Sequence, residues 1–210
     1  MRKIIVLKVG GSLIDGVGGL LGSLKELGAK DDLNLVIVPG GSVFADTVRE
    51  HASNLSDDAA HTMAIFAMDQ YGIYIADRCK IRVIDRLEDI GESCGLSVLL
   101  LSQIMREYDP LPHTWDVTSD TIAAWVASKV GARFIKMTDV DGVFQEGELL
   151  AKVSAHDLKR FGSSCTDHAL PDFLIAHKMD CAVINGRCPH CLKDAIDERA
   201  FKGTLIKGVC

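Results

Sequence analysis

The stretch Lys3-Ile4-Ile5-Val6-Leu7-Lys8-Val9-Gly10-Gly11-Ser12 decides the fold, because it joins a buried strand to a glycine turn. Its first seven residues form a nearly continuous apolar run of strand length, as expected for a parallel strand covered on both faces. Two glycines then end the strand, and a serine follows them. Open α/β sheets bind ligands at such turns, outside the carboxyl ends of their strands.

Similar short apolar runs recur along the chain and alternate with segments of helical periodicity. We predict further strands over residues 34–38, 80–84, 96–101, 133–137 and 181–184. Apolar residues spaced three and four apart predict helices over residues 42–51, 57–76 and 119–130. The alternation predicts an α/β fold, a three-layer αβα sandwich with a mainly parallel central sheet.

Composition limits the class of protein. Of the 210 residues, 48% are hydrophobic and 25% are charged, which excludes a disordered or coiled-coil chain. We predict a single domain over residues 1–210. No apolar run approaches the ~18 residues of a membrane span, and the first strand leaves no room for a signal peptide, so we expect no membrane partner and a cytoplasmic protein. The net charge of −6 argues against a nucleic-acid partner.

The seven cysteines are odd in number and mostly scattered, so we expect reduced thiols packed as small apolar side chains. Cys188-Pro189-His190-Cys191 is the one close pair. A zinc site needs four ligands and this segment supplies two or three, although Cys165, His168 and Cys181 are potential partners. Because Pro189 suits the first turn of a helix, we expect a structural role and no bound metal, with a redox or metal role as the alternative.

A second glycine pair, Val38-Pro39-Gly40-Gly41-Ser42, follows the second predicted strand. Residues without a Cβ let backbone amides approach an anion, and Lys8 would direct its ammonium group to the same region. The alternative is that each glycine pair is only a tight turn. Neither pair matches the phosphate-binding patterns of P-loop or dinucleotide-binding proteins, which disfavours both classes.

A third strand end carries Thr138-Asp139-Val140-Asp141-Gly142-Val143. Its carboxylates and turn glycine could hold the base and ribose of a nucleotide, or could form a plain Asp-Gly turn. Together with the two glycine pairs and Thr118-Ser119-Asp120, this segment resembles the amino acid kinase family. Val183-Ile184-Asn185-Gly186 and Gly203-Thr204-Leu205-Ile206 resemble the C-terminal signature of that family, so the resemblance is collinear over nearly the whole chain.

The resemblance implies an ATP-dependent phosphotransferase with the amino acid kinase fold, ATP with Mg²⁺ as cofactors, and a homodimer or higher homo-oligomer. Lys8 would contact the phosphoryl group in flight, and Asp120 would orient the lysine. The implied ATP-binding residues are Gly10, Gly11, Ser12, Thr138, Asp139, Val140, Gly142 and Val143. The implied residues for a small phosphate acceptor include Gly40, Gly41, Ser42 and Thr118.

Two features depart from the family pattern. Many relatives use a second lysine in a glycine-rich segment, but residues 161–167 contain none, so Lys136 and Lys178 are the nearest candidates. No histidine follows the second glycine pair, where isopentenyl phosphate kinases carry one. His113 is a possible site residue.

Residues 111–120, with residues 57–61 and 68–71, resemble a small subfamily that serves methanofuran biosynthesis by phosphorylating an aminomethyl-furanmethanol phosphate. Such an acceptor suits an aromatic wall, for which Trp115 is the candidate, and a carboxylate for its ammonium group, for which Asp116 and Asp46 are candidates. Trp115 could instead be a core or interface aromatic, and Asp46 an exposed helix residue. Uridylate kinase is the main enzymatic alternative, and a nucleotide- or oxyanion-binding protein of the same fold is the non-enzymatic one.

Overall fold

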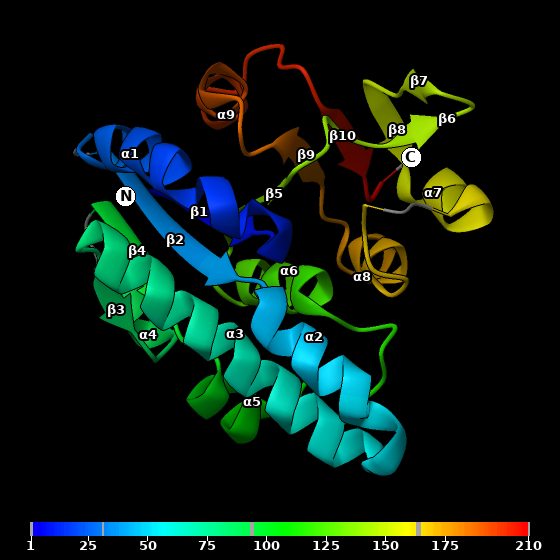
Figure 1. The fold of residues 1–210 in the computed structure, drawn as a ribbon. Coiled ribbons are helices and arrows are strands. Elements are labelled where there is room, and N and C mark those ends of the chain that lie inside the picture. Colours follow the sequence, from blue (N-terminus) through cyan, green and yellow to red (C-terminus); the bar gives the residue numbers. More distant parts are fainter. Residues whose placement is uncertain (1, 31, 93–94, 163–164, 210) are drawn as a thin grey trace.

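A computed structural model describes residues 2–30, 32–92, 95–162 and 165–209. Its main feature is an eight-stranded sheet in the order β3-β4-β2-β1-β5-β9-β10-β8 (Figure 1). All neighbouring strands are parallel except β9 and β10. The strands are β1 (Lys3–Val9), β2 (Leu33–Pro39), β3 (Arg82–Ile84), β4 (Gly95–Leu99), β5 (Arg133–Thr138), β8 (Lys152–Ser154), β9 (Cys181–Asn185) and β10 (Thr204–Lys207).

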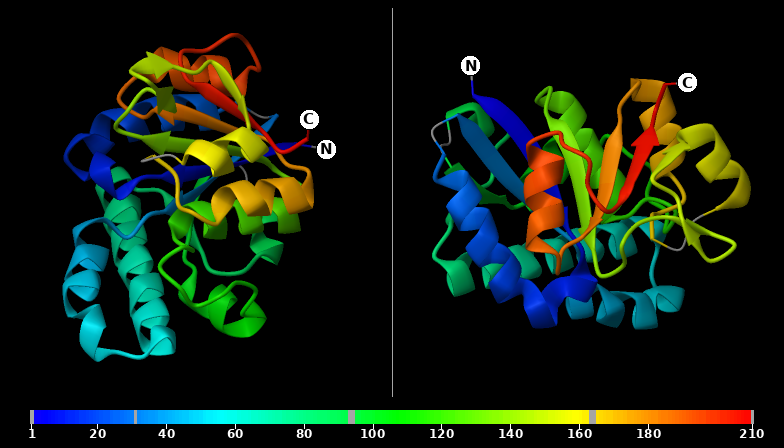
Figure 2. Two further views of the ribbon diagram at one scale, coloured as in Figure 1. Left: turned by 90° about the vertical axis from the view of Figure 1, so that its right-hand side faces the viewer. Right: turned by 90° about the horizontal axis from the view of Figure 1, so that it is seen from above.

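Helices cover both faces of this sheet, which gives the predicted αβα layers (Figures 1 and 2). On one face lie α1 (Val17–Gly28) and α9 (Pro189–Ile196). On the other lie α5 (Ser102–Tyr108), α6 (Ser119–Lys129), α7 (Ala155–Phe161) and α8 (Leu170–His177). The remaining elements are η1 (Gly11–Gly16), α2 (Ser42–His51), η2 (Ala52–Asn54), α3 (Asp57–Cys79), α4 (Glu88–Glu92) and a hairpin of β6 (Phe144–Gln145) and β7 (Glu148–Leu149).

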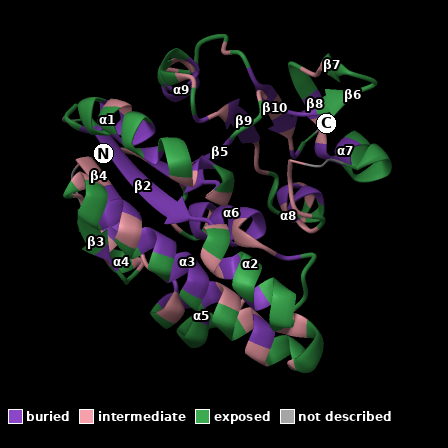
Figure 3. Cartoon of the chain, viewed as in Figure 1, coloured by how far each residue is buried: buried purple, intermediate pink, exposed green. Residues whose placement is uncertain are grey.

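Side chains of the central strands alternate between the two layers because successive residues of a strand point to opposite faces. In β1, Ile5, Leu7 and Val9 pack with α1 and α9, whereas Val6 packs with the α6 and α8 side. The central strands are buried almost throughout, as the purple arrows of Figure 3 show. Burial on both faces explains why these strands are recognisable as continuous apolar runs.

The predicted strands and helices are present, with boundaries that differ by a few residues at most. The third strand begins at Arg82, two residues after the predicted start, and α3 continues to Cys79. The prediction missed two strands of this sheet, β8 and β10, neither of which forms a continuous apolar run; the residues of β10 alternate between buried and half-buried. That one domain spans residues 1–210 stays a prediction. None of the helices in the described ranges is long and apolar enough to cross a membrane.

The expectation that all cysteines are reduced is wrong for one pair. Cys188 and Cys191 form a disulfide across the N-terminus of α9, with their Cα atoms 5.4 Å apart. Their separation of three residues, with Cys188 at the N-cap, brings the two sulfur atoms together within the first helical turn. Cys181 is a buried thiol, as expected, whereas Cys94 and Cys210 lie outside the described residues.

Candidate active site

Two buried lysines and one buried aspartate form the centre of the candidate site. Lys8 of β1 and Lys136 of β5 are register partners on adjacent parallel strands, so their side chains leave the same face of the sheet. The first turn of α6 brings Asp120 over that face. Oδ1 of Asp120 lies 2.7 Å from Nζ of Lys8 and 2.6 Å from Nζ of Lys136. The three residues therefore form one buried charge cluster.

Burial and mutual charge set the protonation of this cluster. Burial lowers the pKa of Lys8 to about 8, because the charge of Asp120 offsets it only in part and Lys136 adds a second positive charge. Burial also acts to lower the pKa of Lys136, but the charge and hydrogen bond of Asp120 outweigh it and raise that pKa. Burial acts to raise the pKa of Asp120, but the two lysines hold it well below its usual range. At neutral pH the cluster therefore carries an excess of one positive charge.

Asp167 supports this cluster from the segment before α8. Its backbone N–H donates to Oδ2 of Asp120 at 3.1 Å. Its carboxylate accepts bonds from the N–H and hydroxyl of both Thr118 and Thr121, at distances of 2.6 to 3.0 Å. Asp167 thus caps the N-terminus of α6 and fixes the helical turn that carries Asp120. Its burial and the charge of Asp120 raise the pKa of Asp167.

The glycine pairs allow two loops to pack against each other beside this cluster. A Cβ on Gly11 would lie 2.5 Å from the Cα of Ser42, and one on Gly40 would lie 3.0 Å from the backbone nitrogen of Gly11. The Ser42 hydroxyl donates to the carbonyl of Gly11 at 3.2 Å. Close backbone approach therefore requires glycine at both positions.

The amides of these loops differ in what they can offer an anion. The N–H of Gly10 donates to Met137 O at 2.9 Å, and the N–H of Gly40 donates to Val9 O at 2.8 Å. Gly11 and Ser42 instead lie in the first turns of η1 and α2, where helical N–H groups have no intrahelical acceptor. Anion binding therefore falls to the residues after the first glycine of each pair.

A cavity of about 480 Å³ opens beside these loops. It is lined by η1, one face of α2, the first turn of α6, one face of α3 and the loop before α6. Among the predicted site residues, those that line it are Gly11, Ser12, Gly41, Ser42, Asp46, Trp115 and Thr118. Lys8, Gly10, Gly40 and Asp120 do not line it, and all four are buried.

Trp115 is an exposed wall residue of this cavity, with 37% of its surface accessible, and so is neither a core aromatic nor far from the site. The Arg49 guanidinium lies over its ring at 4.9 Å and also bonds to Asp46 at 2.9 Å. Of the two predicted carboxylates, Asp46 lines the cavity but is paired, whereas Asp116 is exposed and does not line it.

Two histidines and one aspartate also lie on the cavity wall, and of these only His113 was a candidate from the sequence. His113 lies between Asp58 and Asp109, with ring nitrogens 2.6 and 2.8 Å from their oxygens, and its ring stacks on His61 at 4.0 Å. The hydrogen bonds with Asp58 and Asp109 raise the pKa of His113. Asp57 also lines the cavity, and it has no ion-pair partner in the part of the chain that the structure describes.

The loop after β5 lies next to η1. Oδ1 of Asp139 accepts bonds from the hydroxyls of Ser12 and Thr138, at 2.9 and 3.2 Å, and its pKa is lowered, first by the bond from Ser12. A Cβ on Gly142, whose φ is +156°, would lie 2.5 Å from Oγ1 of Thr204. Val140 is 40% exposed. The loop can therefore present a carboxylate and an apolar side chain to a ligand.

Val143 and the other end of this loop are held by distant residues. The Val143 side chain packs in the core, and its N–H donates to Oγ1 of Thr204 at 2.8 Å. Asp141 accepts a bond from Asn185 at 2.9 Å and pairs with Lys202 at 2.5 Å. Val143 thus shapes the loop through its backbone, and its side chain is turned away from solvent.

The sequence offered Lys136 and Lys178 as a second cation, and the structure separates them. Lys136 is part of the buried cluster, whereas Lys178 is exposed at the C-terminal end of α8. Residues 161–167 contribute Asp167 to the site and no lysine. Asp167 had no recognisable motif, because its role depends on contacts with α6 that are far away in the sequence.

Comparison with known proteins identifies the family of this chain. The amino acid kinase family profile matches residues 3–106 and 84–185. The chain is 33% identical to "[5-(aminomethyl)furan-3-yl]methyl phosphate kinase" of Methanocaldococcus jannaschii, over 97% of this chain and 98% of that protein.

Solved structures share the fold. The uridylate kinase of Archaeoglobus fulgidus matches with a TM-score of 0.75 at 18% identity, over 98% of this chain and 100% of that one. The UMP kinase of Ureaplasma parvum matches with a TM-score of 0.75 at 14% identity, over 98% and 100% of the two chains. The profile match and the 33% identical relative show that the chain belongs to the amino acid kinase family.

Proposed function

We propose that this kinase transfers the terminal phosphoryl group of ATP to [5-(aminomethyl)furan-3-yl]methyl phosphate and forms the diphosphate. The observation that carries the proposal is the buried Lys8–Asp120–Lys136 cluster beside two glycine loops. The relative with 33% identity, which is named as a kinase of this phosphate, supports the choice of acceptor.

The ATP side would be formed by η1 and the loop after β5. The amides of Gly11 and Ser12 would bind phosphate oxygens, and the exposed Val140 would pack against the base. Phosphoryl transfer needs positioning and positive charge around the transferred group more than covalent chemistry. The excess positive charge of the cluster, to which Lys8 contributes, provides the positive charge that the transfer needs.

Mg²⁺ would arrive with ATP and be held mainly by its phosphates. The described residues contain no cluster of three carboxylates that could cage a metal ion. Asp139 fits one position of a magnesium shell, because it is ionised and exposed next to Ser12. Bound Mg²⁺ would neutralise charge on the phosphates, while the chain's own residues orient them.

The acceptor would occupy the cavity with its phosphate at the first turn of α2. The Ser42 and Val43 amides at this helix end are suited to an anion. The furan ring would lie against Trp115, and the ammonium group would reach Asp57. A phosphate oxygen is already ionised near neutral pH, so transfer to it requires no general base.

Asp57 is favoured over the two carboxylates that the sequence suggested. Asp46 is paired with Arg49, and Asp116 does not line the cavity. Asp57 and His61 lie on one face of α3, and His61 stacks on His113, two residues before Trp115. A carboxylate and an aromatic ring therefore lie on the same part of the wall.

An acceptor panel tests the proposal. The purified chain is incubated with MgATP and the furan phosphate, UMP, isopentenyl phosphate or acetylglutamate, and ADP release is followed together with phosphorus NMR of the product. We expect kcat/KM for the furan phosphate to exceed that for UMP by about a hundredfold or more. Preference for UMP would refute the acceptor and leave the family unchanged.

A variant pair tests catalysis itself. Lys8→Ala should lower kcat by about a thousandfold, because the excess positive charge at the transferred phosphoryl group is lost. Lys178→Ala is the matched control, since Lys178 is exposed at the end of α8. Full turnover by a folded Lys8→Ala protein would favour a nucleotide- or oxyanion-binding protein.

A further inference from the structure

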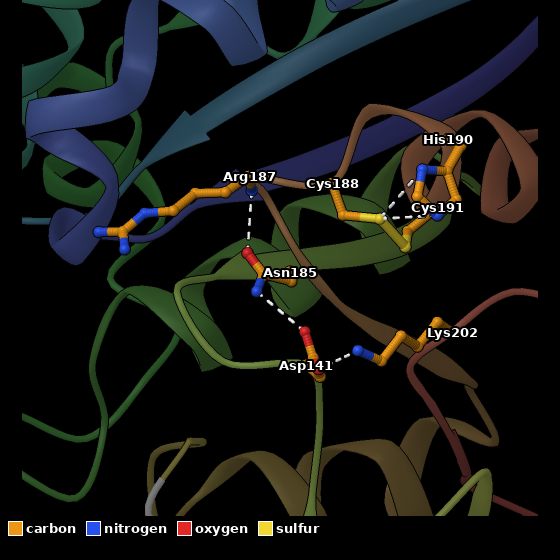
Figure 4. The surroundings of a disulfide bond; sticks show 7 residues. All are labelled: Asp141, Asn185, Arg187, Cys188, His190, Cys191 and Lys202. Atoms are coloured by element: carbon orange, nitrogen blue, oxygen red, sulfur yellow. Dashed lines mark hydrogen bonds and ion pairs between the residues drawn. A yellow bond between two sulfur atoms is a disulfide. The ribbon is translucent and has the colours of Figure 1, made fainter.

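The Cys188–Cys191 disulfide has no part in the proposed transfer, yet it lies next to the nucleotide loops (Figure 4). We propose that this pair is a thiol–disulfide exchange site, reversibly reduced by small-molecule thiols, and that its redox state changes nucleotide binding. The first part stands independently, and the second rests on the proposed function.

Stabilisation of the fold does not account for this disulfide. It closes a loop with a sequence separation of only three residues, which removes little conformational entropy from the unfolded chain. Both cysteines also belong to one helical turn that packing already holds, since Leu192 and Ala195 of α9 are buried in the core. A pair that adds little to stability is suited to a role in which it opens and closes.

The two sulfur atoms differ in accessibility, as an exchange site requires. Cys188 is half-buried, whereas Cys191 is 1% exposed. An incoming thiolate can therefore reach Sγ of Cys188 and not Sγ of Cys191. The geometry assigns Cys188 as the attacked sulfur and Cys191 as the leaving and resolving sulfur.

Two independent features favour negative charge on Cys188. It is the N-cap residue of α9, an eight-residue helix whose N-terminal dipole attracts an anion. The His190 ring lies against the same sulfur, with Nδ1 and Nε2 at 3.5 and 3.3 Å (Figure 4). An imidazole at this distance can donate a hydrogen bond to a thiolate, which makes Cys188 a good leaving group in the second step.

The exchange balances with two thiols. The thiolate of the first attacks Sγ of Cys188, the bond to Cys191 breaks, and the Cys191 thiolate takes up a proton. A second thiolate attacks the small-molecule sulfur of the mixed disulfide and releases Cys188 as a thiolate. The protein disulfide gains two electrons and becomes a dithiol, and two thiols become one small-molecule disulfide.

The chain just before Cys188 connects the pair to the nucleotide loops. The backbone N–H of Cys188 donates to the carbonyl oxygen of Asn185 at 3.0 Å. Oδ1 of Asn185 accepts a bond from the Arg187 N–H at 2.9 Å. Nδ2 of Asn185 donates to Asp141 of the loop after β5 at 2.9 Å. In Figure 4 the Arg187 side chain extends away from the disulfide, and its Nη2 lies 3.5 Å from the carbonyl of Ser12.

These hydrogen bonds connect the redox state of the disulfide to the loops that we propose bind the nucleotide. Packing still holds α9 after reduction, but the segment before it loses the covalent tie of Cys188 to the helix, so the turn that positions Asn185 and Arg187 becomes less constrained. Arg187 would then hold η1 less firmly through Ser12, and Asn185 would hold the loop after β5 less firmly through Asp141. We expect the Kd for ATP to rise about threefold in the reduced protein.

A redox titration of the full chain tests the exchange site. The protein is equilibrated in buffers of graded reduced and oxidised glutathione, quenched with acid, alkylated and analysed by mass spectrometry. Cys188 and Cys191 should become alkylated together, as a two-electron couple, and His190→Ala should shift the midpoint by making the dithiol harder to form. Cys79, half-buried and outside the pair, is the internal reference for alkylation.

Direct ATP binding, measured by calorimetry, tests the coupling without any acceptor. Reduced and oxidised wild-type protein should differ about threefold in Kd. Cys188→Ser and the double variant Cys188→Ser/Cys191→Ala should have one Kd under both conditions, and Cys79→Ser should behave as the wild type. A chain that failed to phosphorylate any acceptor would leave both measurements intact.

Other results would overturn the proposal. A disulfide that resists millimolar thiols in the native protein would be structural. The ligand atoms of Cys188, His190 and Cys191 lie within 4.8 Å of one another, so a metal site is the alternative. Protein prepared without a histidine tag would then contain stoichiometric zinc, and the zinc would protect both cysteines from alkylation. Equal ATP affinity of the two redox forms would refute the effect on nucleotide binding, and only the exchange site would stand.

Discussion

Lys8 and Lys136 are register partners on neighbouring parallel strands, and both bond to the same oxygen of Asp120. One carboxylate therefore compensates two buried ammonium groups, which leaves positive charge where a phosphoryl group would be transferred. A second anion would complete the cluster, and the phosphates of ATP are the anion that we propose. The site is thus electrostatically arranged for its ligand before the ligand binds.

Asp120→Asn should both destabilise the chain and stop turnover. The substitution leaves two buried lysines without a counterion, which costs about 3 to 5 kcal/mol in comparable buried pairs. Urea unfolding measures the loss in the free energy of unfolding, and ADP release measures turnover. Asp172→Asn is the control, because its ion pair with Lys159 is exposed and should contribute less than about 1 kcal/mol. Equal stability of the two variants would contradict a buried charge cluster.

ATP binding should take up protons near pH 8. With its pKa lowered to about 8, Lys8 is partly deprotonated there in the free protein. Anionic phosphates favour the charged lysine and raise its pKa, so binding draws protons from the buffer at pH 8 and almost none at about pH 6. Calorimetry in buffers of different ionisation enthalpy measures the uptake. Lys8→Met should abolish it, and a binding enthalpy independent of buffer at pH 8 in the wild type would refute the assignment.

Asp57→Asn should affect acceptors that carry an ammonium group and spare those that do not. Loss of a charge-assisted hydrogen bond should raise KM for the aminomethyl furan phosphate about tenfold. An acceptor with a hydroxymethyl group in place of the aminomethyl group should be used equally well by both proteins. If KM for the two acceptors rises by the same factor, Asp57 acts on the cavity in general and does not bind the ammonium group.

Gly11→Ala should lower stability and turnover together. The new methyl group would lie 2.5 Å from the Cα of Ser42, so the two glycine loops would have to separate. We expect a loss of about 1 to 3 kcal/mol in the free energy of unfolding and a higher KM for ATP. Gly18→Ala is the matched control, because a Cβ at Gly18 of α1 meets nothing within 4 Å. Alanine there should stabilise the helix by about 0.5 to 1 kcal/mol.

The sequence predicted the sheet well because its central strands are buried on both faces and are therefore continuous apolar runs. Lys8 and the glycine pairs were recognisable for a local reason, since each lies within a few residues of a strand end. The pairing of Lys8 with Lys136 depends on strand register, which no local pattern contains.

Other parts of the site depend on contacts between distant segments. Asp167 caps a helix that begins about 50 residues earlier, and Asp57 looks like an ordinary helix-start residue until α3 is placed beside the cavity. The disulfide was missed because the odd cysteine count favoured reduced thiols, although Cys188 and Cys191 have the spacing of a helical turn. Asp116 was adjacent in sequence to Trp115, but it does not line the same cavity.

The position of β10 determines when a functional nucleotide loop can exist. This strand lies between β9 and β8, and Oγ1 of its Thr204 both accepts the N–H of Val143 and donates to Leu150 O. Residues 143 and 150 are synthesised well before residue 204, so the loop between them cannot form these bonds until residue 204 has been synthesised. During synthesis, the Lys8 strand can pair with β2 early, but ATP affinity should develop only after residues 204–207 have left the ribosome.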